Sequence, residues 1–378
     1  MQNNELSQKT TRADLKNDGV YARQIAFFAA FVLPMYKLLE VPSLLARFAK
    51  GDLLLPAFLQ FLLQTGVIVA LLFAASRSEK TLFERMEEKL GKWSVAVYIL
   101  CAAYFLFAAV LPLLDLEKFI YAAFYDTSPT FFSFAAFFLF CGYACTRGLK
   151  SVGRSADLSL FLFLLPFLIL LVMACTETDV TNLLPLFEQK PRATLSAITY
   201  TAPHFSDAAL LLPLIGNLRF QKNDGKKIVA GYWTGALCVL VFLGIFFGLY
   251  SSIAAREHYA FSKIAQYFPV LSVIGRIDLL LVYMLCVVLF FNVSAPLQYA
   301  VHFLSKTAHT KRKTLFAAAV VVAAFLFTLF CNKYYNAVYA LFCERLYPLF
   351  WVLAILAPLA FLLLSLRGKN KKKEADRA

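Results

Sequence analysis

Charged and helix-breaking residues interrupt the first long apolar stretch of this chain. The stretch from Phe31 to Asp52 carries two prolines, a lysine and a glutamate in its apolar part: Pro34, Pro42, Lys37 and Glu40. On a helix rising about 1.5 Å per residue, Lys37 lies about 20 Å beyond Arg23, near the centre of a bilayer. A lysine at that depth costs about 2.5–3.5 kcal/mol. Each proline leaves a carbonyl without its usual partner, which hydrocarbon tolerates only beside protein or a wet cavity. The stretch predicts a broken membrane helix around a binding site.

A second cluster of the same kind lies in the middle of the chain. The residues from Thr201 to Asp207 read Thr-Ala-Pro-His-Phe-Ser-Asp, and Pro203 follows Arg192 by eleven residues, as Pro34 follows the arginine before it. Interrupted helices at matching places in two opposed halves are typical of inverted-repeat transporters. We expect one site formed by both breaks and by a later polar pair. Its candidate residues are Pro34, Tyr36, Lys37, Glu40, Thr201, His204, Asp207, Asn292 and Ser294.

The residue types at the breaks favour binding over catalysis. Exposed amides at the end of a half-helix suit a carboxylate, whereas freed carbonyls suit an ammonium or another cation. Lys37 has two candidate partners, Glu40 three residues on and Asp207 across the site. Lys37 has two possible roles, a structural buried ion pair or a role in binding or gating. His204 is either a packing residue or a functional one. Since the sequence has no nucleophile–base pair, phosphate loop or metal-ligand set, we expect neither an enzyme nor a cofactor.

Composition places the chain among helical integral membrane proteins. It has 378 residues, of which 61% are hydrophobic, and its mean hydropathy is +0.68. Its charges gather between apolar runs of about twenty residues, the length that spans a bilayer. The net charge of +14 comes from basic loops rather than from a nucleic-acid module, so we expect the partner surface to be a lipid bilayer and no nucleic acid. The fold class is all-α.

Ten apolar segments give the expected domain organisation. A polar tail over 1–20 precedes one transmembrane domain over 21–366, and a basic tail over 367–378 follows it. The expected spans are 22–46, 53–76, 93–116, 130–147, 156–175, 196–217, 228–252, 276–301, 314–331 and 339–365. Spans one to five and six to ten would form the two halves of the inverted repeat.

The distribution of basic residues predicts the orientation. One set of alternate loops and both tails carry 26 Lys and Arg residues, whereas the other loops carry 10. Basic residues concentrate on the cytoplasmic side of membrane proteins, so both termini are expected there. Residues 79–92 have an apolar stripe and predict an amphipathic helix on the cytoplasmic surface. Residues 253–271 have a similar pattern on the outer side, and a gate over the outer mouth and a packed connector are equally open.

Short motifs spread over most of the chain carry a family resemblance. They are Leu38-Leu39-x-x-Pro42-Ser43, Ala49-x-x-Asp52, Leu114-x-x-x-Lys118-Phe119-Ile120, Ser128-Pro129, Tyr143-x-x-x-Arg147-Gly148-Leu149-Lys150-x-x-x-Arg154-Ser155-Ala156-Asp157, Thr181-Asn182-Leu183-Leu184-Pro185 and Tyr267-Phe268-Pro269-Val270. With these motifs in this order, the chain resembles the B-subunit family of nutrient germinant receptors of endospore-forming bacteria. That family belongs to the amino acid–polyamine–organocation transporter superfamily.

The resemblance implies a fold, a function and partners. The fold would be a LeuT-like, 5+5 inverted repeat with broken helices 1 and 6. The chain would sense a small nutrient, an amino acid first of all, in the spore inner membrane and start germination. Its partners would be a receptor A-type membrane subunit and a C-type lipoprotein. Relatives usually carry glycine where this chain has Met35-Tyr36-Lys37, so the Lys37 ammonium is also a candidate for the place of a coupling cation or of a ligand amine.

Two other functions are compatible with the same sequence. The first is a proton- or cation-coupled amino acid permease, which would work alone. The second is a ligand-insensitive structural or channel-forming subunit.

Overall fold

The computed structural model of the chain describes residues 20–77, 80–110, 112–116, 130–184, 187–257, 259–267, 278–307 and 313–341, with isolated positions from 345 to 360. The described residues form helices and no strand, which confirms the all-α class. Four helical stretches of the described chain are long and apolar enough to cross a membrane: Val41–Ser76, Leu82–Leu116, Asp224–Arg256 and Thr314–Cys331. The number of ten spans and the inverted repeat stay predictions.

The first membrane segment is broken, as the prolines predict. It consists of α2 (Ala22–Phe27), the π-helical turn η1 (Phe28–Val32), α3 (Leu33–Tyr36) and α4 (Val41–Ala49). Pro34 has no amide hydrogen and its ring crowds the preceding turn, so the backbone widens there. The amide of Leu33 accordingly donates to the carbonyl of Phe28, five residues back. Residues 37–40, which we call the first break, are not helical.

The sixth predicted segment is broken in the same way. Helix α11 (Pro191–Thr201) passes into the 3-10 turn η5 (Ala202–His204), and α12 (Asp207–Gly216) follows after two non-helical residues. Pro203 lies inside the turn. Residues 202–206 form the second break, and both predicted breaks are thereby confirmed.

The remaining long helices are continuous. They are α5 (Leu54–Ser76), α7 (Ser94–Ala108), α9 (Thr130–Thr146), α10 (Leu149–Glu177), α13 (Asp224–Tyr250), α16 (Asp278–Thr307) and α17 (Lys313–Lys333), with the short α18 (Tyr335–Ala340) after them. Helix α10 begins before the predicted 156 and α16 ends after the predicted 301, because their polar ends continue the helix beyond the apolar core. Most of the predicted span 339–365, residues 1–19 of the first predicted tail and all of the second lie outside the described residues.

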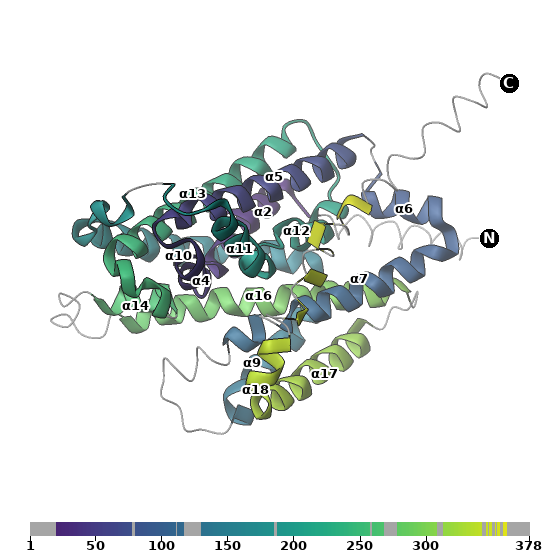
Figure 1. Ribbon diagram of the computed structural model, residues 1–378. Coiled ribbons are helices and arrows are strands. Elements are labelled where there is room, and N and C mark those ends of the chain that lie inside the picture. The colour runs from purple at the N-terminus through teal and green to yellow at the C-terminus, as the bar shows by residue number, and fades with distance from the viewer. Residues whose placement is uncertain are drawn as a thin grey trace, which may run out of the picture.

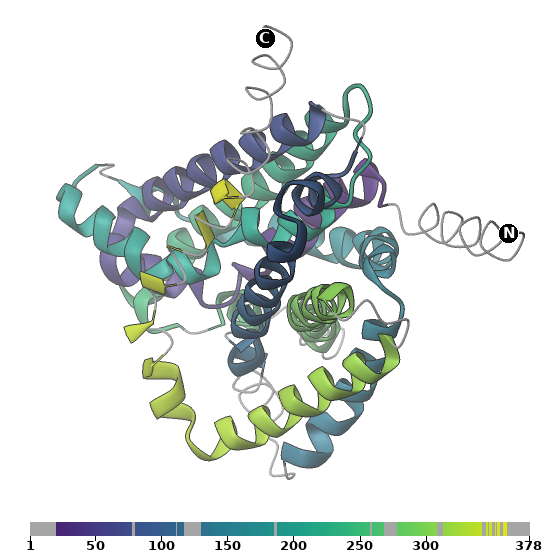
Figure 2. The ribbon, with the colours of Figure 1, turned by 90° about the vertical axis from the view of Figure 1, so that its right-hand side faces the viewer.

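The helices pack in layers around α16. Helices α2, α5 and α13 lie side by side on one flank, and α9 and α17 pair on the other (Figure 1). Viewed along its axis, α16 lies in the middle, in contact with α7, α9, α10 and α17 (Figure 2). Two glycines bring α13 close to the first segment: a Cβ at Gly231 would lie 2.5 Å from the carbonyl oxygen of Ala26, and one at Gly235 would lie 2.4 Å from that of Ala30. Small residues permit such backbone contact between membrane helices.

Short helices close the two ends of the bundle. At one end, α6 (Leu82–Leu90) begins with a Thr81–Glu84 capping box, and Glu87 pairs with Lys306 at 3.5 Å. At the opposite end, η6 (Ser251–Arg256) and α14 (Ala260–Tyr267) cover the bundle (Figure 1). Loops that the charge pattern assigns to one side thus lie together in space. Which end faces the cytoplasm stays a prediction.

Candidate functional site

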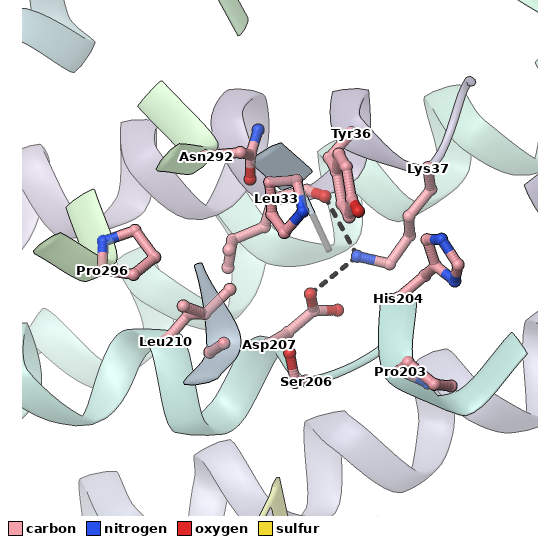
Figure 3. A pocket seen from close by; sticks show the side chains of 12 residues that line it. Leu33, Tyr36, Lys37, Pro203, His204, Ser206, Asp207, Leu210, Asn292 and Pro296 are labelled. Carbon is pink, nitrogen blue, oxygen red and sulfur yellow. Dashed lines mark hydrogen bonds and ion pairs between the residues drawn. The ribbon is translucent and has the colours of Figure 1, made fainter. Parts of the chain in front are cut away.

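A buried ion pair joins the two breaks. The ammonium of Lys37 lies 2.6 Å from Asp207 Oδ1, and both side chains are 1% exposed. The same ammonium donates to the carbonyl oxygen of Leu33 at 3.0 Å (Figure 3). Lys37 is the first residue of the first break, and Asp207 is the first residue of α12, where the positive end of the helix dipole favours a carboxylate. Of the two partners considered for Lys37, the structure places Asp207 on its ammonium.

Aromatic side chains surround this ion pair. The Lys37 ammonium lies 5.0 Å from the ring centre of Phe205 and 5.8 Å from that of Phe61. The hydroxyl of Tyr232, on α13, donates to Asp207 Oδ2 at 2.7 Å. Ring faces attract cations within about 6 Å, and a desolvated contact of this kind is worth about 2 kcal/mol. The two rings therefore stabilise the ammonium, and the Tyr232 hydroxyl stabilises the carboxylate, in addition to the attraction between the two charges.

A second polar group lies beside the pair and includes a residue that the sequence analysis missed. Asp115, which is 1% exposed, accepts a hydrogen bond of 2.5 Å from the Tyr36 hydroxyl. His204 Nε2 lies 3.9 Å from the same Asp115 oxygen, and its ring stacks on Tyr36 with 5.5 Å between centroids. An aspartate one turn after Pro112 in an apolar helix is a signal for such a position.

Two glutamines of α5 satisfy the second break, and these were missed as well. Gln64 Oε1 accepts from the Ala208 amide at 3.0 Å, at the start of α12. Gln60 Nε2 donates to Thr201 Oγ1 at 2.8 Å, at the end of α11. Residues four apart lie on one helix face, so the Gln-x-x-x-Gln spacing in an apolar segment marks a face that meets polar backbone.

Helix α14, in the predicted connector 253–271, covers the first break directly. The amide of Ala260 donates to the carbonyl of Leu39 at 3.1 Å, and that of Phe261 donates to the carbonyl of Leu38 at 3.2 Å. The first amides of a helix lack helix partners, and so do the carbonyls of the non-helical first break, among them that of Leu38, which Pro42 leaves free. The amides of α14 donate to the carbonyls of the break, and these hydrogen bonds hold α14 on the break. Whether it also gates the site stays a prediction.

A small cavity lies at the meeting point of the breaks. Its volume is about 20 Å³, room for about one water molecule. Of the predicted site residues, Tyr36, Lys37, His204, Asp207 and Asn292 line it (Figure 3). Asn292 also donates to the carbonyl of Val288 at 2.9 Å. Among the described residues, no group of His, Cys, Asp or Glu is arranged to hold a metal ion.

The other predicted site residues are buried outside the cavity lining. Pro34 faces α13, where its Cγ would lie 2.3 Å from a Cβ at Gly235. Thr201 faces α5, and the backbone carbonyl of Glu40 accepts from Ser43 at 2.9 Å. Ser294 is 1% exposed, and its hydroxyl has no hydrogen-bond partner within the described part of the chain. A binding role for all nine residues stays a prediction.

The sequence profile of the spore permease family, described as spore germination protein, matches residues 54–336. The chain belongs to this family. The match covers the second break and most of the helices around α16, while the first break precedes it. No curated protein matches this germination protein.

A solved structure supports a transporter fold for the germination protein. It is a Na+-coupled sialic acid symporter in a substrate-bound, outward-open state, similar over 89% of this chain and 77% of its own, with 12% identity and a TM-score of 0.50. At this identity the likeness concerns the fold alone. The family match and this fold together make the germination protein a transporter-like membrane protein.

Proposed function

We propose that this germination protein is the transporter-like subunit of a nutrient germinant receptor and senses a small nutrient where its two broken helices meet. The observation that carries the proposal is the Lys37–Asp207 pair, 2.6 Å apart and buried at both breaks of a chain from the spore germination family. Charged residues at membrane depth are costly and usually serve a site. Amino acids are the first nutrient class to test.

Sensing would use a change in the packing of the broken helices. The cavity has room for about one water molecule in this conformation, so a nutrient needs the half-helices to move apart. Tyr36, His204 and Asn292 line the cavity and would contact the nutrient. A ligand shifts such an equilibrium only by binding one conformation more tightly than the other. The wider conformation would then pass the signal to a partner.

The partners and the location are proposed from the family resemblance alone. We propose an A-type membrane subunit and a C-type lipoprotein as partners, in the spore inner membrane, with both termini in the cytoplasm. A receptor subunit needs such partners to convert binding into germination, whereas a permease acts by itself.

The test is germination of spores that carry cavity variants. His204→Gln and Asn292→Ala should shift the nutrient concentration for half-maximal germination at equal protein abundance. The matched control is His302→Gln, since His302 lies on α16 outside the cavity lining. Unchanged concentration dependence in both cavity variants contradicts nutrient sensing at this site. Saturable uptake by the purified chain in vesicles, without partners, would instead identify a coupled permease.

A further inference from the structure

We infer that the centre of this protein is a preformed ammonium site and that the chain fills it with its own Lys37. The inference concerns what the proposed sensing site accepts and to that extent rests on the proposed function. Its geometry and its test need no germination, so the two can fail separately.

The walls around the Lys37 ammonium have the chemistry that recognises an alkylammonium. They are a carboxylate oxygen of Asp207 at 2.6 Å, the carbonyl of Leu33 at 3.0 Å, and the ring faces of Phe205 and Phe61 at 5.0 and 5.8 Å. A carboxylate, a carbonyl and aromatic faces together suit a monovalent organic cation. Each contact is made with the ammonium group at the end of the side chain.

These walls are held in place by residues other than Lys37. Tyr232 holds the second oxygen of Asp207 at 2.7 Å. The amide after Asp207, that of Ala208, is held by Gln64 at 3.0 Å. Phe205 packs edge-on against Phe61, with 5.1 Å between ring centroids. Removing the Lys37 side chain should therefore leave the walls standing, as a binding site requires.

The tethered ammonium excludes an external one. The cavity beside it measures about 20 Å³, which is too small for an amine of several carbons. A nutrient that enters while Lys37 stays must bind through other groups, without presenting a cation to Asp207. For the same reason the wild-type protein needs no coupling cation at this position.

The experiment removes the Lys37 ammonium by substitution and adds a free alkylammonium that can take its place. Lys37→Ala removes three methylenes and the ammonium, which n-propylammonium replaces. The thermal unfolding midpoint of the full chain in detergent is measured against n-propylammonium chloride, with sodium chloride at equal ionic strength and 1-propanol as the neutral isostere. We expect a saturable rise of a few degrees for Lys37→Ala with n-propylammonium only. Lys37→Met, which fills the space, and Lys37→Ala with Asp207→Asn, which lacks the carboxylate, should show none.

Two results overturn the inference. The first is a folded Lys37→Ala variant whose midpoint does not respond to n-propylammonium, or responds equally to 1-propanol. The second result concerns the wild-type protein, so it can be measured even if the Lys37→Ala variant does not fold. Because its site is filled, neither sodium nor n-propylammonium should raise its midpoint specifically, and a saturable rise with either cation would show that the site accepts an external cation.

Discussion

At the scale of residues, one ion pair dominates the energetics of this protein. Lys37 and Asp207 are each 1% exposed, so neither charge is hydrated. Desolvating two charges is expensive, and their attraction offsets the cost only when further hydrogen bonds satisfy both groups. Here Leu33 and Tyr232 supply those bonds. The net stabilisation by the intact pair is therefore smaller than the stability that is lost when one partner is removed.

This asymmetry gives the first prediction. Lys37→Met and Asp207→Asn should each lower the free energy of unfolding by about 3–5 kcal/mol, since each leaves one buried group uncompensated. The double variant should lose less than the sum, which a double-mutant cycle by denaturant titration in detergent measures. Lys263→Met is the control, because Lys263 is exposed beside Glu257 and should cost no more than about 1 kcal/mol. Additive losses in the cycle contradict the pairing.

At the scale of elements, the broken first segment depends on two neighbours. Helix α13 approaches it through Gly231 and Gly235, and α14 caps its break with two amides. A proline-broken helix has unpaired carbonyls that membrane lipid cannot satisfy. Close backbone packing on one side and capping on the other make the break stable, and each contact can be tested separately.

Replacing Gly235 by alanine should destabilise the protein. Its Cβ would lie 2.3 Å from Pro34 and 2.4 Å from the Ala30 carbonyl, so the helices must separate. Overpacking of this kind costs about 1–3 kcal/mol. Gly244→Ala in the same helix is the matched control, because its nearest neighbour would lie 3.9 Å away. That variant should gain about 0.5–1 kcal/mol from helix propensity. Equal effects on the unfolding free energy would argue against close packing at Gly235.

The capping by α14 predicts slow hydrogen exchange at Ala260 and Phe261. First-turn amides of a helix usually lack partners and exchange fast, but these two donate to Leu39 and Leu38. The comparison is Arg192, an exposed residue in the first turn of α11. Exchange followed by mass spectrometry should be slower at 260–261 than at Arg192. Exchange at 260–261 as fast as at Arg192 contradicts the capping.

At the scale of the whole molecule, the two ends are built differently. The end with α6 carries the Lys306–Glu87 pair and the basic loops, and the end with α14 carries a tighter cover over the first break. At that second end Asp52 accepts the amides of Phe187 and Gln189 at 2.5 and 2.7 Å. The charge asymmetry of 26 against 10 predicts that the α6 end faces the cytoplasm.

Cysteine labelling tests this orientation. In a background without the native cysteines, residues introduced at Lys80 and Lys222 should be shielded from an impermeant thiol reagent added outside intact cells. One introduced at Lys190 should be labelled. All three positions are exposed, so the membrane alone decides the result. Labelling of the first two with protection of the third would reverse the topology.

The sequence by itself determined the class of this protein and the location of its breaks. Proline chemistry and apolar run length act within a few residues, so Pro34 and Pro203 mark the breaks without knowledge of the fold. The α6 helix follows in the same way from its local stripe and its capping box. The family, too, rests on local motifs that the profile match confirms.

Only the tertiary structure decided which groups meet. Lys37 and Asp207 are 170 residues apart, and Tyr36 and Asp115 are 79 apart. Their contact depends on how each helix is rotated about its axis and which neighbours it packs against, and one sequence specifies neither locally. The same holds for α14, whose amides reach the carbonyls of a segment more than two hundred residues earlier. Burial then settles the chemistry, because a charge without water must be satisfied by whatever the packing brings to it.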